Sequence, residues 1–216
     1  MKCRAFVPLV LVACAALAGA CKDSTASGAI VRTSTDTMVA LAVTGTPLTS
    51  PSALSLVGYR ADTADDLFAD PSLLRVDSIF DFDLVFDIDA AGKTVLMTPQ
   101  SVANRLAVRV IPTSLGPRGV GPHRVGLQVA TAGTNFETIE ESPNGGFVYD
   151  SLVRVDPGSA VFVQSYVTFC SGLVRPFLFA KLVVDSANAA TRKVYFRVTL
   201  NRNCGYRSFR PGIPTV

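Results

Sequence analysis

A period of two in the apolar residues is the feature that most restricts what this chain can fold into. Residues 178–184 and 194–200 carry an apolar side chain at every second position, and the segment 186–191 between them is small and polar. A period of two is typical of a strand with one buried and one solvated face. The two segments therefore predict a β-hairpin near the C-terminus.

Two further segments predict strands in different environments. Ile79–Asp89 alternates strictly, with an apolar row on one face of the strand and an acidic row, which also holds Val85, on the opposite face. The apolar row is Phe80, Phe82, Leu84, Phe86 and Ile88, and the acidic row is Asp81, Asp83, Asp87 and Asp89. We expect one face of this strand to be buried and the other wet. Residues 160–170 are apolar on both faces and predict a central strand covered on both sides.

The rest of the chain has the composition of strands and turns. It has 16 Gly and 13 Pro, lacks Trp, and carries many Val and Thr residues. Only residues 62–75 suggest a short helix, and the Gly- and Pro-rich segment 112–124 predicts a long exposed loop. The sequence predicts an all-β protein: a single antiparallel β-sandwich, or a partly open barrel, of about eight to nine short strands with little helix. We expect this one domain to span residues 31–216, without an internal repeat.

The first twenty residues have the parts of a secretory signal peptide. Lys2 and Arg4 make a basic start, Ala5 to Ala20 is an uncharged run of Val, Leu and Ala, and small residues end it. This run is shorter than the roughly 20 apolar residues that span a bilayer. We expect residues 1–20 to be removed on export.

The junction after the signal resembles the lipobox of bacterial lipoproteins. Leu17-Ala18-Gly19-Ala20-Cys21 places a cysteine after small residues, and the resemblance implies that Cys21 is acylated and becomes the new N-terminus. Ala18-Gly19-Ala20 also fits ordinary signal peptidase, and Leu11-Val12-Ala13-Cys14 is a second lipobox match with a shorter apolar core. With Lys22 rather than Asp after the cysteine, the resemblance further implies an outer-membrane or cell-surface lipoprotein. Residues 21–30 would be a lipid-anchored tether.

Cysteine parity supports lipidation at Cys21. Cys3 and Cys14 leave with the signal, so Cys21, Cys170 and Cys204 remain. An unpaired thiol in an exported protein needs an explanation, and a lipid on Cys21 leaves Cys170 and Cys204 to pair. The sequence predicts a structural disulfide between them, since no CxxC motif or nearby histidine favours a redox or metal site.

No motif assigns catalytic residues or a cofactor. Asp87 and Asp89, with Gly92, match part of a calcium-binding EF-hand loop, but Thr98 stands where the bidentate Glu is required, so they are weak metal candidates at most. His123 is the single histidine, and no motif of a serine hydrolase or zinc enzyme accompanies it. We expect it to be a solvated loop residue.

Charge is divided along the chain although the total is small. Without residues 1–20 the chain has 18 basic and 17 acidic residues, a net of +1, which gives no electrostatic case for nucleic acid. Residues 60–92 carry a net of −7 and residues 175–216 a net of +7. The two segments would pair across a sheet, or the basic one would face anionic lipid or glycan.

These observations favour an envelope protein held to the membrane by its lipid, with a non-catalytic binding or structural role. An envelope protein or a glycan is the expected partner. An envelope hydrolase with carboxylates that sequence cannot reveal is one alternative. A carbohydrate-binding module is another, in which tyrosines replace the missing Trp platforms; the candidates are Tyr59, Tyr149, Tyr166, Tyr195 and Tyr206.

Overall fold

Ten β-strands make up about half of the part of the chain that the computed structural model describes, which is residues 33–56, 70–76, 82–105, 124–167 and 176–210. The strands are β1 (Thr33–Leu41), β2 (Pro51–Ser55), β3 (Ser72–Arg75), β4 (Leu84–Ile88), β5 (Thr94–Met97), β6 (Val125–Val129), β7 (Leu152–Val155), β8 (Ala160–Tyr166), β9 (Phe177–Asn188) and β10 (Lys193–Asn201). Two short helices accompany them, α2 (Pro99–Arg105) and the 3-10 helix η3 (Phe136–Thr138).

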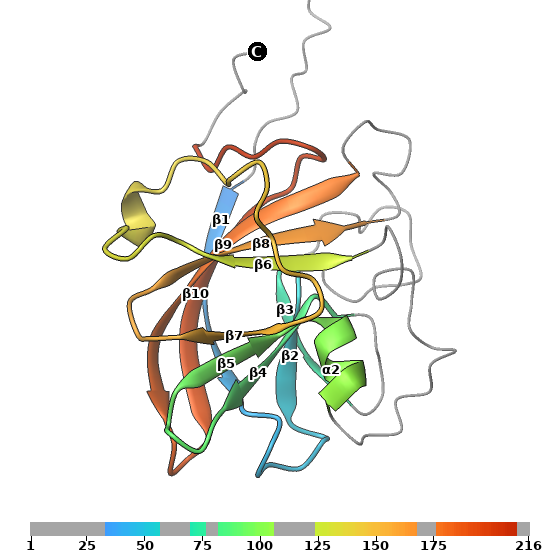
Figure 1. The fold of residues 1–216 in the computed structure, drawn as a ribbon, viewed down its shortest axis with the longest axis vertical. Coiled ribbons are helices and arrows are strands. Elements are labelled where there is room, and N and C mark those ends of the chain that lie inside the picture. The colour runs from blue at the N-terminus through green and yellow to red at the C-terminus, as the bar shows by residue number, and fades with distance from the viewer. Residues whose placement is uncertain (1–32, 57–69, 77–81, 106–123, 168–175, 211–216) are drawn as a thin grey trace, which may run out of the picture. The chain divides into compact units, whose positions relative to one another are not determined.

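The strands form two antiparallel sheets of five (Figure 1). One sheet has the order β1-β10-β9-β8-β6 and the other β3-β2-β4-β5-β7. The largest apolar cluster takes residues from both, including Leu54, Phe86 and Leu96 from the second sheet and Leu127, Leu182 and Phe196 from the first. The predicted all-β sandwich is thereby confirmed, and the sheets are not closed into a barrel.

The predicted C-terminal hairpin is confirmed, and its two predicted inward rows face the core. β9 pairs with β10, and the alternate residues 178–184 and 194–200 all lie in the central cluster. Phe196 packs on Phe86 of the opposite sheet with ring centroids 4.4 Å apart. Every residue of β8 is buried, as expected for a strand covered on both faces.

Two smaller apolar clusters cover the outer faces of the sheets, and they correct the expectation for Ile79–Asp89. The strand begins only at Leu84, and Phe82 and Val85 lie in the outer cluster with Val102 of α2 rather than between the sheets. Residues 77–81 lie outside the described residues. Asp83 is not on a wet face: it is fully buried and accepts hydrogen bonds from the Leu56 N–H at 2.6 Å and from the Ser165 hydroxyl.

The one α-helix of the described part lies where none was expected. The predicted segment 62–75 contains a strand, β3, in its described portion, whereas α2 begins at Pro99. Thr98 caps α2 by accepting the Ser101 N–H at 3.2 Å, and proline suits the first helical position because it has no N–H to satisfy. Neither helix of the described residues has the length and apolarity to cross a membrane. The predicted loop 112–124 lies outside the described residues except for Arg124.

Candidate functional site

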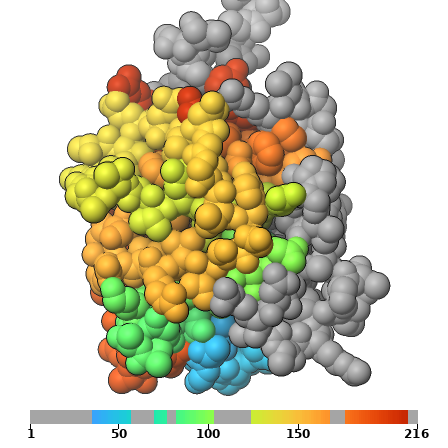
Figure 2. Space-filling model, in the orientation of Figure 1, coloured from blue at the N-terminus to red at the C-terminus, as the bar shows by residue number. Residues whose placement is uncertain are grey.

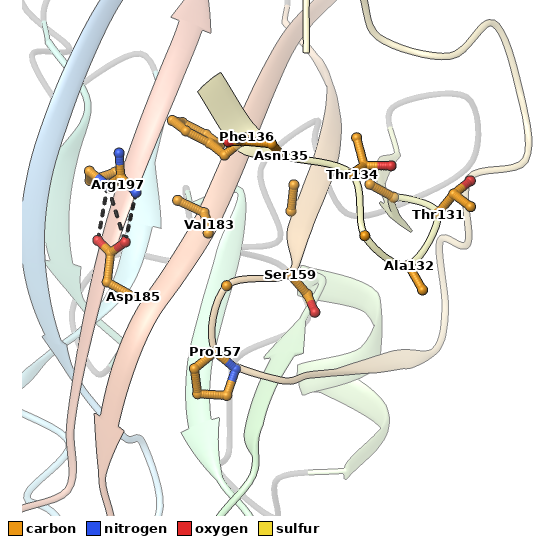
Figure 3. A pocket seen from close by; sticks show the side chains of 14 residues that line it. Thr131, Ala132, Thr134, Asn135, Phe136, Pro157, Ser159, Val183, Asp185 and Arg197 are labelled. Atoms are coloured by element: carbon orange, nitrogen blue, oxygen red, sulfur yellow. Dashed lines mark hydrogen bonds and ion pairs between the residues drawn. The ribbon is translucent and has the colours of Figure 1, made fainter. Parts of the chain in front are cut away.

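The larger of two neighbouring hollows on the outer face of the first sheet is a groove of about 530 Å³ (Figure 3). Its walls are the loop 130–136, which follows β6, and the turn 157–160, which leads into β8. Val183, Asp185 and Arg197 of the central hairpin complete the lining. Figure 3 shows the Asp185–Arg197 pair on one side and the loop with Thr131 and Thr134 on the other. We call this hollow the groove.

Among the described residues of the lining Arg197 is the only cation, and two carboxylates already hold it. It donates to Asp185 through Nε at 3.1 Å and through Nη2 at 2.9 Å, and it also donates to Glu137. These hydrogen bonds raise the pKa of Arg197. Its guanidinium lies 5.1 Å from the centre of the Phe136 ring. With two carboxylates bonded to one guanidinium, this cluster carries no excess positive charge.

A buried lysine of the sheet fixes the end of the loop 130–136. Lys181 of β9 is 6% exposed, and its ammonium donates to the carbonyl oxygens of Phe136 at 2.7 Å and Ile139 at 3.0 Å. Burial lowers the pKa of Lys181. Asn135 caps η3 by accepting the Glu137 N–H at 2.9 Å. The loop 130–136 is thus held at its end by both a cap and a charge.

The second hollow adjoins the groove. It measures about 380 Å³, and Ala130 and Thr131 line both. Arg207 lies in its wall, where it donates to Glu141 and to the Ser142 carbonyl at 2.9 Å. On the face shown in Figure 2 the segment between β6 and β8 forms a large part of the surface. The two hollows extend along this segment.

Apart from the Asp185–Arg197 ion pair, the groove offers neutral hydrogen-bonding groups. Thr131, Thr134, Asn135 and Ser159 bring hydroxyl and amide groups, and the remaining lining is mostly Ala, Gly and Pro. Phe136 lines it too but is buried, with Lys181 and Arg197 both stacked on its ring. The described lining of the groove therefore offers polar contacts without an aromatic stacking surface.

The weak metal candidates are held by arginines. Asp87 accepts from Arg192 at 2.8 Å and from the Thr44 hydroxyl at 2.7 Å. Asp89 accepts from Arg154 at 3.0 Å and from the Lys93 N–H at 3.0 Å, and these bonds lower its pKa. Within the described ranges no group of three or more His, Cys, Asp or Glu side chains is placed to hold a metal ion.

Ion pairs between the basic and the acidic segment link one sheet to the other, and they do not lie between neighbouring strands of a single sheet. Arg192–Asp87 and Arg202–Asp70 join the basic and acidic segments. Other arginines of the basic segment pair with acids at 137–141, outside the acidic segment 60–92. Arg210 donates to Glu140 and lowers the pKa of that carboxyl. Most carboxylates of the described part accept from an arginine in this way.

The remaining predicted residues fall in two groups. Cys21, Cys170, His123 and Tyr59 lie outside the described residues. Cys204 follows β10 and packs against the central cluster. Because Cys170 lies outside the described residues, the Cys170–Cys204 disulfide stays a prediction.

The four described tyrosines do not form a row. Tyr166 is buried edge-on to Phe177, and the Tyr149 hydroxyl donates to Gln164 at 2.8 Å. Tyr195 and Tyr206 are the exposed ones, on β10 and in the segment after it. These positions do not supply the flat aromatic platform that the carbohydrate-binding alternative required.

The architecture and the groove define a two-sheet antiparallel β-sandwich with an open polar groove on the outside of one sheet. A comparison of the chain with known protein families, with characterised proteins and with solved structures finds no match.

Proposed function

We propose that the chain is an exported, lipid-anchored envelope protein that acts as a non-catalytic binding domain, and that the groove takes an uncharged, polyhydroxylated ligand such as an envelope glycan. The signal peptide and the lipobox at Cys21 support export and anchoring. The groove supports binding, because its volume of about 530 Å³ falls in the range of roughly 300–1,000 Å³ of ligand sites.

The observation that carries the ligand class is the state of Arg197. With Asp185 and Glu137 both bonded to it, this cation has no surplus charge for an anionic ligand. A neutral ligand with several hydroxyl groups can both donate to the carboxylates and accept from the loop's hydroxyl groups. Without an aromatic stacking surface, we expect weak binding, with a Kd of about 1 mM, equivalent to roughly 4 kcal/mol.

The anchor is tested by metabolic labelling in a bacterium with a fatty-acid probe. The chain should take up the label and partition into detergent, and Cys21→Ser should abolish both. Cys14→Ser is the matched control, since it lies at the competing lipobox, and should leave the label unchanged. Labelling that survives Cys21→Ser would refute lipidation at this residue.

The groove is tested by filling it. Ala132→Tyr places a ring among the lining residues, and Ala190→Tyr makes the same change on the exposed β9–β10 turn. Neutral oligosaccharides of the envelope and uronic acid oligosaccharides of equal length are titrated while amide spectra are recorded. We expect shifts at 130–136 and 157–160 with the neutral set, weakened at least tenfold by Ala132→Tyr alone. Equal weakening by both variants, or preference for the anionic set, would contradict the proposal.

A further inference from the structure

The chain enters the described domain at the same end at which β10 leaves it. β1 and β10 are antiparallel, with Thr33 opposite Asn201 and Leu41 opposite Lys193. Residues 202–210 therefore start at the entry end, which we define by Thr33 and this segment. The loop 42–50 follows Leu41 at the other end of β1. A strand of nine residues is about 30 Å long, and this length separates the two ends.

A lipid on Cys21 would keep the entry end close to the bilayer. Thr33 lies twelve positions after Cys21, with eleven residues between them. A chain of that length reaches at most about 40 Å, and a flexible one has a root-mean-square extension of about 20 Å. The loop 42–50 lies a further strand length from the entry end, so it is on average the more distant of the two from the lipid.

The segment 202–210 has the chemistry of a surface that rests on lipid headgroups. Tyr206 is 42% exposed, and tyrosine is enriched at membrane interfaces because its ring is apolar and its hydroxyl polar. The three arginines of the segment are each paired with an acid: Arg202 with Asp70, Arg207 with Glu141 and Arg210 with Glu140. The described part of this surface is thus electrically balanced, which suits a zwitterionic bilayer as well as an anionic one.

We propose that the entry end rests on the bilayer that holds the Cys21 lipid, with Tyr206 in the headgroup region and the loop 42–50 pointing away from the membrane. This inference rests on the lipid anchor of the proposed function. The partner of the segment 202–210 is then a lipid surface.

The absence of Trp from the sequence allows a direct test. Tyr206→Trp and Leu48→Trp each introduce a single fluorescent reporter, at sites 42% and 38% exposed and at opposite ends of β1. The full lipidated chain is reconstituted into phosphatidylcholine vesicles with or without brominated acyl chains. We expect the emission of the Tyr206→Trp variant to shift to the blue. Brominated lipid should quench it at least threefold more than it quenches the Leu48→Trp variant.

The outcomes separate the two proposals. A chain that fails to co-float with vesicles refutes the anchor and this inference together. A chain that co-floats but shows equal quenching in the two variants, or more in Leu48→Trp, refutes the orientation and leaves the anchor intact. Quenching of Tyr206→Trp that appears only with anionic lipid and vanishes with salt also overturns the inference, because a balanced surface predicts no such dependence.

Discussion

Replacing Lys181 by methionine tests whether the buried ammonium holds η3 on the sheet. Methionine keeps the length and the apolar contacts of the side chain but removes the donors to the Phe136 and Ile139 carbonyls. A hydrogen bond to a charged group contributes about 1.5–3 kcal/mol, so two of them contribute roughly 3–6 kcal/mol. Relief from burying the charge offsets part of this loss.

We expect Lys181→Met to lower the free energy of unfolding by about 2 kcal/mol. The Phe136 carbonyl keeps a weak bond from the Ile139 N–H at 3.4 Å, so the loss stays below the full sum. For a domain of this size the melting temperature should fall by roughly 4–8 °C. Urea denaturation measures the change, and Lys193→Met on an exposed site of β10 should stay within about 0.5 kcal/mol of the wild type.

Local and pH-dependent measurements identify the cause. Hydrogen exchange at amides 137–139 should quicken in Lys181→Met before exchange in the sheet does. Because burial lowers the pKa of Lys181 below its ordinary value of 10.5, the unfolded chain binds more protons between those two pKa values. The wild type should therefore gain stability over Lys181→Met as pH rises through this window. A variant as stable as the wild type, with unchanged exchange at 137–139, would refute the argument.

Three further predictions concern packing, a turn and the cysteines. Gly126→Ala should cost about 1–3 kcal/mol in urea denaturation, because a Cβ there would lie 2.7 Å from the Tyr149 ring, whereas Gly145→Ala, with nothing within 4 Å, should be near neutral. Arg192→Ala should lower the free energy of unfolding by about 2 kcal/mol, because the hydrogen bonds of the guanidinium, including that to Asp87, are lost. Arg192→Gly should cost about 1 kcal/mol less, because φ is +57° at this residue and glycine adopts that conformation without strain. An alanine variant more stable than the glycine variant would contradict this argument. Mass spectrometry of the non-reduced protein should find the peptides of Cys170 and Cys204 linked, and free alkylation of both thiols without denaturant would exclude the bond.

The sequence predicts well those strands in which each face has the same burial along the whole strand. The hairpin of β9 and β10 keeps its inner rows 178–184 and 194–200 on the central cluster, so a period of two describes those rows. β8 is apolar at nearly every position because both faces are covered, and it was predicted as such. The facing of these strands follows from burial, whereas the bulge in the pairing of β9 with β10 has no counterpart in the apolar pattern.

The outer layers could not be predicted, because they depend on contacts distant in sequence. Val85 was placed with the aspartates, yet it is buried because α2 covers that side of β4. The capping pair Thr98-Pro99 was a readable start signal for α2 that the strand pattern obscured. The groove joins Arg197 to Glu137, 60 residues away, and no local pattern marks such a pairing.

The pairing of β1 with β10 joins the first described strand to the last. Thr35 and Thr199 share a hydrogen bond across 164 residues, so β1 has no partner in its sheet until nearly all of the chain is present. A chain that crosses a membrane N-terminus first would have β1 across long before β10 arrives. Folding of this sheet must then wait for the end of translocation. During that interval a strand that begins with Thr, Ser and Asp is safer to leave unpaired than a wholly apolar one.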